Sequence, residues 1–150
     1  MDKIMATQYS EKAAMSMKTW MQVFRTYNKI RAKELVYIQS FDLTMHQFQV
    51  LEVLYHKGDL NIGSITKLTM STPGNITVVV KNLKRDGLIV SLQDENDRRA
   101  SILSITQKGK DIIEKLFPQH AKNFEEYFKV LDKQELETLY TLLKKVQKSQ

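Results

Sequence analysis

Hydroxyl, amide and ammonium side chains gather on one face of a helix that we expect from Thr72 to Asp86. The hydroxyls and the amide lie near its N-terminal end, with a glycine among them and a lysine further along. These residues are Ser71, Thr72, Gly74, Asn75, Thr77 and Lys81. Hydroxyl and amide groups can bond base edges, free N–H groups of a helix N-terminus favour phosphate oxygens, and a glycine lets the backbone approach closely. We interpret this face as a major-groove surface, although the same residue types also cap and solvate ordinary helices.

Two arginines lie at the tip of a predicted β-hairpin. Residues 88–92 and 101–105 have the composition of strands, and the segment 93–99 between them is wholly polar. This segment ends in Asp97, Arg98 and Arg99. A guanidinium group suits a narrow, electronegative minor groove, and the Asp97 carboxylate can hold one arginine extended. The alternative is a charged turn that only keeps the hairpin soluble, but the polar helix just before it favours duplex DNA as the partner.

The net charge of +6 is concentrated in the same part of the chain. Residues 67–110 carry eight Lys or Arg against four Asp or Glu, whereas residues 111–150 carry seven of each kind. An excess of positive charge in one segment attracts a polyanion. Charge alone is equally compatible with a solvated surface, so the DNA interpretation depends on the helix and the hairpin as well.

The elements that must position these residues follow from periodicity and capping. Apolar residues three or four apart predict helices, and Thr44 with Gln47 and Asp132 with Glu135 have the spacing of capping boxes. Pro118 is expected to end the helix that begins after Thr106. The expected order is helices over 10–39, 44–57, 61–68 and 72–86, strands over 88–92 and 101–105, a helix over 107–118, a helical stretch around 124–128 and a last helix over 133–146. The chain is therefore predicted to be mainly α with a small β-wing.

Composition excludes several classes of function. The 150 residues include no cysteine, which excludes disulfides, thiolate metal sites and cysteine-based redox sensing. We find no nucleophile–base pair or phosphate-binding glycine loop, and His46, His56 and His120 lack the spacing of metal ligands. We therefore expect no enzyme, no metal site and no cofactor. Charged residues interrupt every apolar run and the N-terminus has no signal sequence, so we expect no membrane partner and a cytoplasmic location.

Four motifs between Leu43 and Gly109 share their spacing with a known family. They are Leu43-Thr44-x-x-Gln47-Phe48-x-Val50-Leu51, Lys81-x-Leu83-x-Arg85-Asp86-Gly87-Leu88-Ile89, Asp97-Arg98-Arg99 and Ser104-Ile105-Thr106-x-Lys108-Gly109. On these motifs the chain resembles the MarR family of bacterial winged helix-turn-helix transcription regulators. Ile105 departs from the usual leucine, and Leu92 stands where the family often has a basic residue. The resemblance implies a sequence-specific double-stranded DNA-binding regulator in one domain, with a winged helix-turn-helix lobe over 43–106 and a helical dimerisation region formed by 1–42 and 107–150.

The resemblance also implies a homodimer, and the expected terminal helices agree with it. They carry more large apolar side chains than an elongated helical body of this length readily buries alone. These side chains belong to Trp20, Phe24, Phe117, Phe124, Phe128, Leu139 and Leu143. Two-fold symmetry would place the two recognition helices about one helical turn apart on a pseudopalindromic operator.

Members of the MarR family often respond to small phenolic or lipophilic ligands that bind between the dimer helices and the DNA-binding lobe. The ligand-binding residues that this resemblance implies are Trp20, Phe24, Tyr27, Met45, His46 and Phe48. Met and aromatic residues at helical spacing are also typical of a plain core. We expect a repressor that is released by a small aromatic or lipophilic effector. The alternative is a constitutive or architectural DNA-binding regulator without a ligand.

Overall fold

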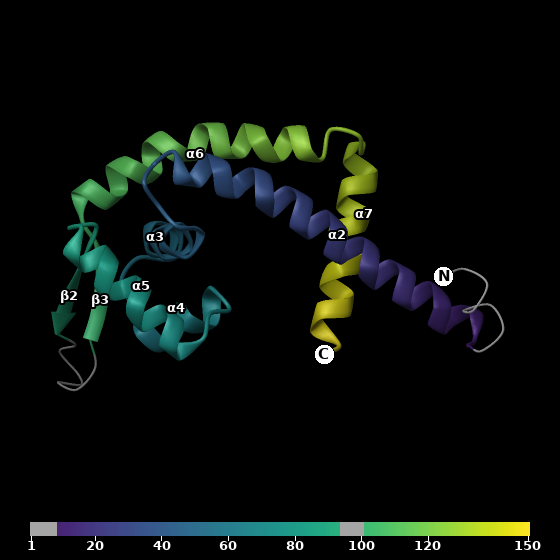
Figure 1. The fold of residues 1–150 in the computed structure, drawn as a ribbon, viewed down its shortest axis with the longest axis horizontal. Helices are drawn as coiled ribbons and strands as arrows, with labels where there is room; N and C mark the ends of the chain where they lie inside the picture. The colour runs from purple at the N-terminus through teal and green to yellow at the C-terminus, as the bar shows by residue number, and fades with distance from the viewer. Residues whose placement is uncertain (1–8, 94–100) are drawn as a thin grey trace. The chain divides into compact units, whose positions relative to one another are not determined.

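Long helices and one small sheet make up the computed structural model, which describes residues 9–93 and 101–150. In chain order the elements are α2 (Glu11–Gln39), α3 (Met45–Lys57), β1 (Leu60–Asn61), α4 (Ile62–Leu68), α5 (Pro73–Arg85), β2 (Ile89–Gln93), β3 (Ser101–Ile105), α6 (Gln107–Tyr127) and α7 (Lys133–Lys148) (Figure 1). The mainly helical architecture with a small β-wing confirms the predicted fold class. The chain divides into two compact units, residues 1–36 and residues 37–150.

The first unit consists mainly of α2, whose surface is unusually apolar. The side chains of Trp20, Phe24 and Tyr27 are 66%, 50% and 59% exposed. Their spacing of four and three residues places them on one face of the helix. This face therefore presents aromatic groups to solvent in the isolated chain.

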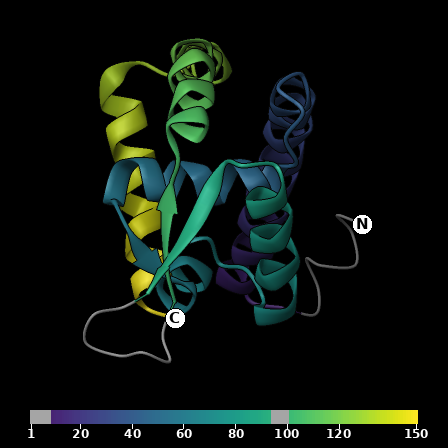
Figure 2. The same ribbon diagram turned by 90° about the vertical axis from the view of Figure 1, so that its left-hand side faces the viewer.

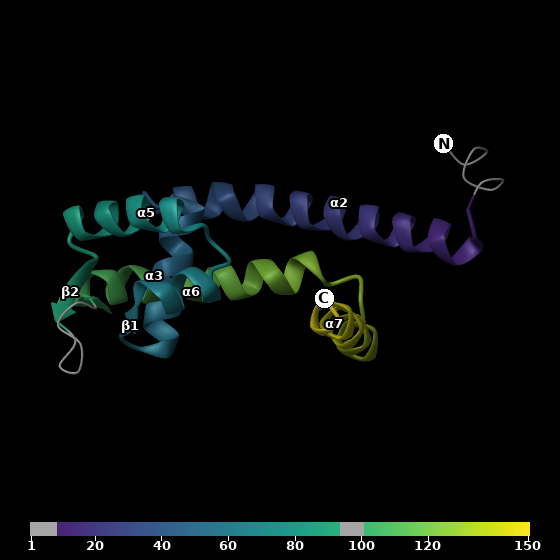
Figure 3. The ribbon, with the colours of Figure 1, turned by 90° about the horizontal axis from the view of Figure 1, so that it is seen from below.

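The core of the second unit is built from the inner faces of α3, α5 and α6, closed by α4 and the sheet. Figures 1 and 3 show α3, α4 and α5 grouped beside the strands. The core side chains are Phe48, Val50, Leu51, Leu54, Ile65, Ile76, Val79, Val80, Leu83, Leu103, Ile113 and Leu116. Because α5 buries four of them, the direction of its opposite face is fixed.

The sheet has three strands in the order β1-β3-β2, all antiparallel. Ile89 pairs with Ile105 and Gln93 with Ser101, so the two strands form the predicted hairpin, with β2 beginning one residue later than expected. Strand β1 was not predicted, because two residues are too few to show an alternating pattern. It is defined by its pairing with β3, where Leu60 lies opposite Leu103. Figure 2 shows α6 continuing from the end of the sheet strand β3.

The prediction that a helix ends at Pro118 is wrong, because α6 runs without interruption from Gln107 to Tyr127. A proline removes one backbone hydrogen bond but does not end a helix whose two sides are held by packing. Before the proline, Ile113 and Leu116 are fully buried. After it, the His120 ring lies 5.2 Å from the ring of Phe48 in α3. Tertiary contacts on both sides therefore keep the helix continuous.

Helix starts agree with the predicted caps. The Thr44 hydroxyl accepts a hydrogen bond from the Gln47 amide at 3.1 Å, and the Gln47 side chain accepts one from the Thr44 amide at 2.9 Å. Asp132 and Glu135 form the same reciprocal pair. Both predicted capping boxes are confirmed. Within residues 9–93 and 101–150, none of the helices combines the length and the hydropathy needed to cross a bilayer.

Candidate nucleic-acid interface

Helices α4 and α5 form the two arms of a helix-turn-helix. The turn between them is closed by backbone hydrogen bonds from Thr69 to Ile65 at 2.9 Å and from Ser71 to Thr66 at 3.1 Å. Met70 takes a left-handed conformation with φ of 52° and is 89% exposed. A non-glycine residue in this conformation costs energy that the surrounding hydrogen bonds must offset. The turn therefore sets the angle between the two helices.

At the N-terminal end of α5, the residues predicted to bind DNA also form hydrogen bonds within the chain. The Thr72 hydroxyl accepts a hydrogen bond from the Asn75 amide at 3.3 Å and so caps the helix. Its own proton stays available to a phosphate oxygen. The Thr77 hydroxyl donates to the Pro73 carbonyl at 2.9 Å, so towards DNA it can act only as an acceptor. The half-buried Ser71 hydroxyl lies 2.9 Å from that of Thr69.

The predicted outer face of α5 is directed to solvent. Thr72, Gly74, Thr77 and Lys81 are exposed, whereas Asn75 is half-buried. Among the described residues, nothing lies within 4 Å of the position that a methyl group on Gly74 would take. Open space over this glycine leaves the helix backbone accessible to a ligand.

Two further residues on this face, Val78 and Arg85, were not among the candidates and are exposed as well, as is the neighbouring Lys84. Val78 is 58% exposed, although the next two residues in the sequence, Val79 and Val80, are buried. Because the three consecutive residues are all valine, residue type alone does not show which of them faces outward. The helical period, anchored on the buried Ile76 and Leu83, is the signal that could have identified it.

A set of hydrogen bonds braces the C-terminal end of α5 against the start of α6. The Lys108 ammonium donates to the Asp86 carbonyl at 2.8 Å, and the Thr106 hydroxyl donates to the Gly87 carbonyl at 2.7 Å. Gly87 has a φ of 72°, which favours glycine. A methyl group on Gly109 would lie 2.5 Å from the Leu88 carbonyl oxygen, so only glycine fits there. These contacts fix α5 relative to the sheet and α6.

An ion pair extends this brace to the last residue of α5. Arg85 Nε donates to Asp86 Oδ1 at 2.9 Å, and Arg85 Nη2 donates to Asp86 Oδ2 at 3.4 Å. The hydrogen bond from Arg85 lowers the pKa of the Asp86 carboxyl below its ordinary value, and the same bond raises the pKa of Arg85. The exposed guanidinium group is therefore paired with the Asp86 carboxylate at the surface.

The wing candidates Asp97, Arg98 and Arg99 lie outside the described residues. The strands on both sides of them, β2 and β3, are described and paired up to Gln93 and Ser101. The chain therefore leaves the sheet and re-enters it at neighbouring positions.

The predicted ligand-binding residues belong to different parts of the chain. Trp20, Phe24 and Tyr27 form the exposed aromatic face of α2. In the second unit, Phe48 is 3% exposed and belongs to the core, Met45 is half-buried and His46 is exposed. For Phe48, burial supports the simpler interpretation as a core residue.

Sequence reasoning missed a row of aromatic rings along α6. The ring of Phe117 lies 5.0 Å from His56 of α3 and 5.3 Å from His120, which lies 4.9 Å from Phe124. The spacing of these α6 residues is a helical signal, but the contact with α3 is not visible in the sequence. Beside this row is a cavity of about 300 Å³ lined by Tyr55, Ile113, Glu114, Phe117, Pro118 and Ala121.

One polar contact borders this cavity. The Tyr55 hydroxyl donates to Glu114 Oε1 at 3.3 Å. Desolvation, followed by the negative charge of Glu114 and this hydrogen bond, raises the pKa of Tyr55. A mostly apolar hollow with one acidic group at its edge suits an uncharged aromatic molecule better than an anion.

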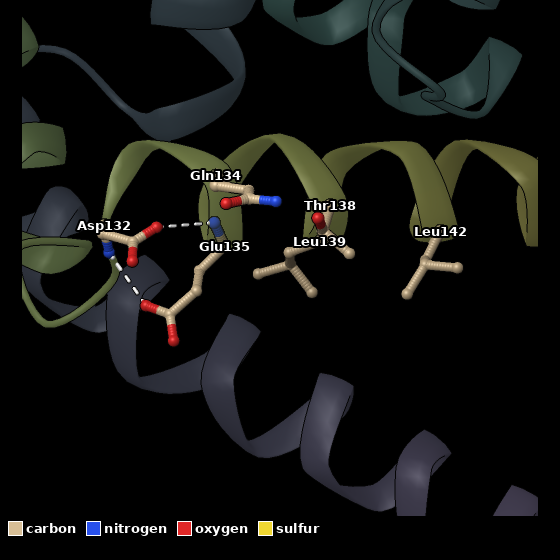
Figure 4. Close-up of a pocket in the computed structure, with 6 residues that line it drawn as sticks. All are labelled: Asp132, Gln134, Glu135, Thr138, Leu139 and Leu142. Carbon is tan, nitrogen blue, oxygen red and sulfur yellow. Dashed lines mark hydrogen bonds between the residues drawn. The ribbon is translucent and has the colours of Figure 1, made fainter.

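A second hollow, of about 420 Å³, lies along α7 (Figure 4). It is lined by Asp132, Gln134, Glu135, Thr138, Leu139 and Leu142. Every residue of α7 is described, and none of its side chains is buried. Within the described ranges, no group of three His, Asp or Glu side chains is arranged to hold a metal ion.

Comparisons with known proteins agree with the geometry of this site. The sequence pattern of the MarR family matches residues 43–101. The chain is 34% identical to the HTH-type transcriptional regulator MhqR of Bacillus subtilis over 131 residues, which cover 87% of this chain and 90% of the relative.

Two solved structures have the same fold. A mutant of MarR from E. coli complexed with operator DNA superimposes with a TM-score of 0.81 at 24% identity, covering 91% of this chain and 99% of the other. BpsR of Bordetella bronchiseptica, whose DNA binding is regulated by 6-hydroxynicotinic acid, has a TM-score of 0.79 at 25% identity, with coverage of 87% and 98%.

Proposed function

The chain belongs to the MarR family of DNA-binding transcription regulators, and from this premise we propose that it binds a specific duplex operator with α5 in the major groove. The observation that carries the proposal is the outer face of α5. Four buried side chains hold the helix in the lobe, while Thr72, Thr77 and Lys81 stay exposed and Asn75 is half-buried. A helix with that arrangement can enter a groove without losing core contacts.

The proposed contacts follow from the hydrogen-bonding capacity of each side chain. The Ser71 and Thr72 hydroxyls and the free amides at the start of α5 bind phosphate oxygens. Asn75 and Thr77 contact base edges, and the open space over Gly74 lets the backbone approach. Lys81, one turn further on, contacts a phosphate.

On the wing, we propose that Arg98 and Arg99 enter the minor groove, with Asp97 holding one of the guanidinium groups. This assignment rests on the sequence and on the described strands, whose paired residues Gln93 and Ser101 lie at the same end of the sheet. Arginine is favoured in narrow minor grooves because of their negative potential.

We propose that the active form is a homodimer assembled through α2, α6 and α7. The proposal is supported by apolar surface that this chain alone leaves uncovered. Trp20 on α2 is 66% exposed, and on α7 Tyr140 and Leu142 are 63% and 55% exposed. Covering such side chains with a second copy would bury them without any change of fold. The two α5 helices of a dimer would then recognise a pseudopalindromic operator.

We further propose that the protein is a cytoplasmic repressor released by a small aromatic or lipophilic ligand. Support comes from BpsR, in which 6-hydroxynicotinic acid regulates DNA binding, and from the exposed aromatic face of α2. The second candidate function is constitutive DNA binding without a ligand. Titration of the operator complex with a panel of phenols and aromatic acids separates the two, since a constitutive regulator would keep its affinity throughout.

The DNA-binding proposal is tested by selecting bound fragments from a random duplex pool and measuring affinity for the selected site by fluorescence anisotropy. Replacing Arg98 and Arg99 together by alanine should lower affinity at least tenfold and leave the circular dichroism spectrum unchanged. The matched control replaces Lys129, which lies between α6 and α7, and Lys133, the first residue of α7, and so removes the same charge away from the wing. Equal effects of the two double substitutions would rule out a specific role of the wing.

A further inference from the structure

Val78 is an apolar residue at the centre of the exposed face of α5. Gly74, Val78, Lys81 and Arg85 follow one another at intervals of four, three and four residues, which places them in one stripe along the helix. Opposite this stripe are the buried Ile76, Val79, Val80 and Leu83. Val78 therefore occupies the position that would approach a groove most closely.

The fold gains little from a valine at this position. Its side chain is 58% exposed, so most of its apolar surface is not removed from water in the free protein. A β-branched residue also lowers helix stability relative to alanine or lysine. Val79 and Val80 already provide the apolar contacts of this segment with the core. A contact with another molecule would account for a valine at this position.

The neighbouring residues leave the approach to Val78 open. One turn before it, Gly74 has no side chain, and the space above it is empty of described atoms within 4 Å. The adjacent Thr77 hydroxyl has its proton in a hydrogen bond to the Pro73 carbonyl. One turn after it, the exposed Lys81 supplies positive charge that can anchor a phosphate. A flat base edge can therefore reach Val78 without a clash.

In the major groove, the thymine 5-methyl is the apolar group that a base edge offers. An isopropyl side chain makes no hydrogen bonds, so against an amino or carbonyl edge it would displace water and leave a polar group unpaired. Against a thymine methyl it buries two apolar groups together. Resting on the proposed placement of α5 in the major groove, we propose that Val78 is a specificity-determining residue that packs against the 5-methyl group of a thymine in each half-site.

The contact can be tested by removing methyl groups from the DNA or from the protein. Each thymine of the selected operator is replaced in turn by deoxyuridine, which keeps the Watson–Crick pairing and lacks only the methyl. At one position in each half-site, the wild-type protein should lose about threefold to tenfold in affinity, since about one methyl contact is lost. Replacing that thymine–adenine pair by 5-methylcytosine–guanine should be less damaging than replacing it by cytosine–guanine, because the 5-methyl group is retained.

Val78→Ala is the matching change in the protein. Alanine favours a helix more than valine does, so the variant is expected to fold, which a thermal melt checks. It should bind the thymine and deoxyuridine operators equally well, both at about the affinity of wild type for deoxyuridine. The control Val90→Ala removes the same group from an exposed position on β2 and should keep the preference for thymine.

Two results would overturn the assignment of Val78. One is a wild-type protein that is insensitive to every deoxyuridine substitution, and the other is a Val78→Ala variant that retains the full preference for thymine. In both cases specific binding to the selected operator would persist and the proposed function would stand. If no selected duplex is bound more tightly than random DNA, the proposed function itself fails and the inference fails with it.

Discussion

Replacing Gly109 by alanine should destabilise the protein, although alanine is the better helix former. A methyl group at this position would lie 2.5 Å from the Leu88 carbonyl oxygen and 2.7 Å from Ile105 Cγ1. Carbon and oxygen atoms in contact lie about 3.3 Å or more apart, so the start of α6 and the chain at Leu88 must separate by about 0.8 Å. The clash with a backbone atom cannot be relieved by a rotamer change.

The magnitude is a difference between two opposing effects. Forcing an extra methyl into a packed site costs about 1–3 kcal/mol, and two simultaneous clashes favour the upper part of that range. The gain from removing a helical glycine is at most about 1 kcal/mol. We expect a net loss of about 2 kcal/mol, which corresponds to a decrease in Tm of about 4–8 °C for a chain of this length.

Urea unfolding of both proteins at one fixed concentration measures the difference, since the stability of a dimer depends on concentration. Gly74→Ala is the matched control, because its added methyl meets nothing within 4 Å among the described residues. That variant should be as stable as the wild type or up to about 1 kcal/mol more stable. A Gly109→Ala protein with unchanged or increased stability would show that the junction between Leu88 and α6 can open by this distance without loss of stability.

Three further predictions concern charge and assembly. Lys81→Ala should weaken operator binding and reduce the slope of log affinity against log salt by about one, measured by anisotropy at several salt concentrations; an unchanged slope would argue against a phosphate contact. Because the Arg85 hydrogen bond lowers the pKa of Asp86 in the folded state, its stabilising effect is present above the ordinary Asp pKa and is lost as the pH falls through the lowered value. Asp86→Asn should therefore be less stable than wild type at neutral pH and equal to it in acid, and a constant difference across urea titrations would contradict this. Replacing Trp20 and Phe24 by serine should shift the protein towards monomers in sedimentation velocity, whereas an unaltered dimer would remove the α2 face from the interface.

The substitution Gly74→Ala should change the stability of the fold and the affinity for the operator in opposite directions. If the backbone of α5 approaches DNA closely at this glycine, Gly74→Ala should bind the operator more weakly although its fold is at least as stable. Anisotropy and urea unfolding on the same preparation measure the two effects. Unchanged affinity would indicate that the backbone at this position stays away from the DNA.

Several features of this protein were determined by sequence alone because they depend on interactions within one or two helical turns. The capping pairs Thr44–Gln47 and Asp132–Glu135, and the cap of α5 at Thr72, join residues three apart. Apolar periodicity gave the inner face of α5, and with it the polar outer face. The motifs of the winged helix-turn-helix gave the family for the same reason, since their residues stand at fixed local spacing.

The tertiary structure decided what depends on contacts between distant residues. Strand β1 exists because Leu60 pairs with Leu103, and α6 continues past Pro118 while residues beyond the proline pack on α3. The Lys108 bond to the Asp86 carbonyl spans 22 residues. The extent to which Val78 remains exposed, 58%, is likewise set by the packing of α5 on the core. A linear pattern records which side chains are apolar, but which of them is covered depends on the elements that the fold brings against them.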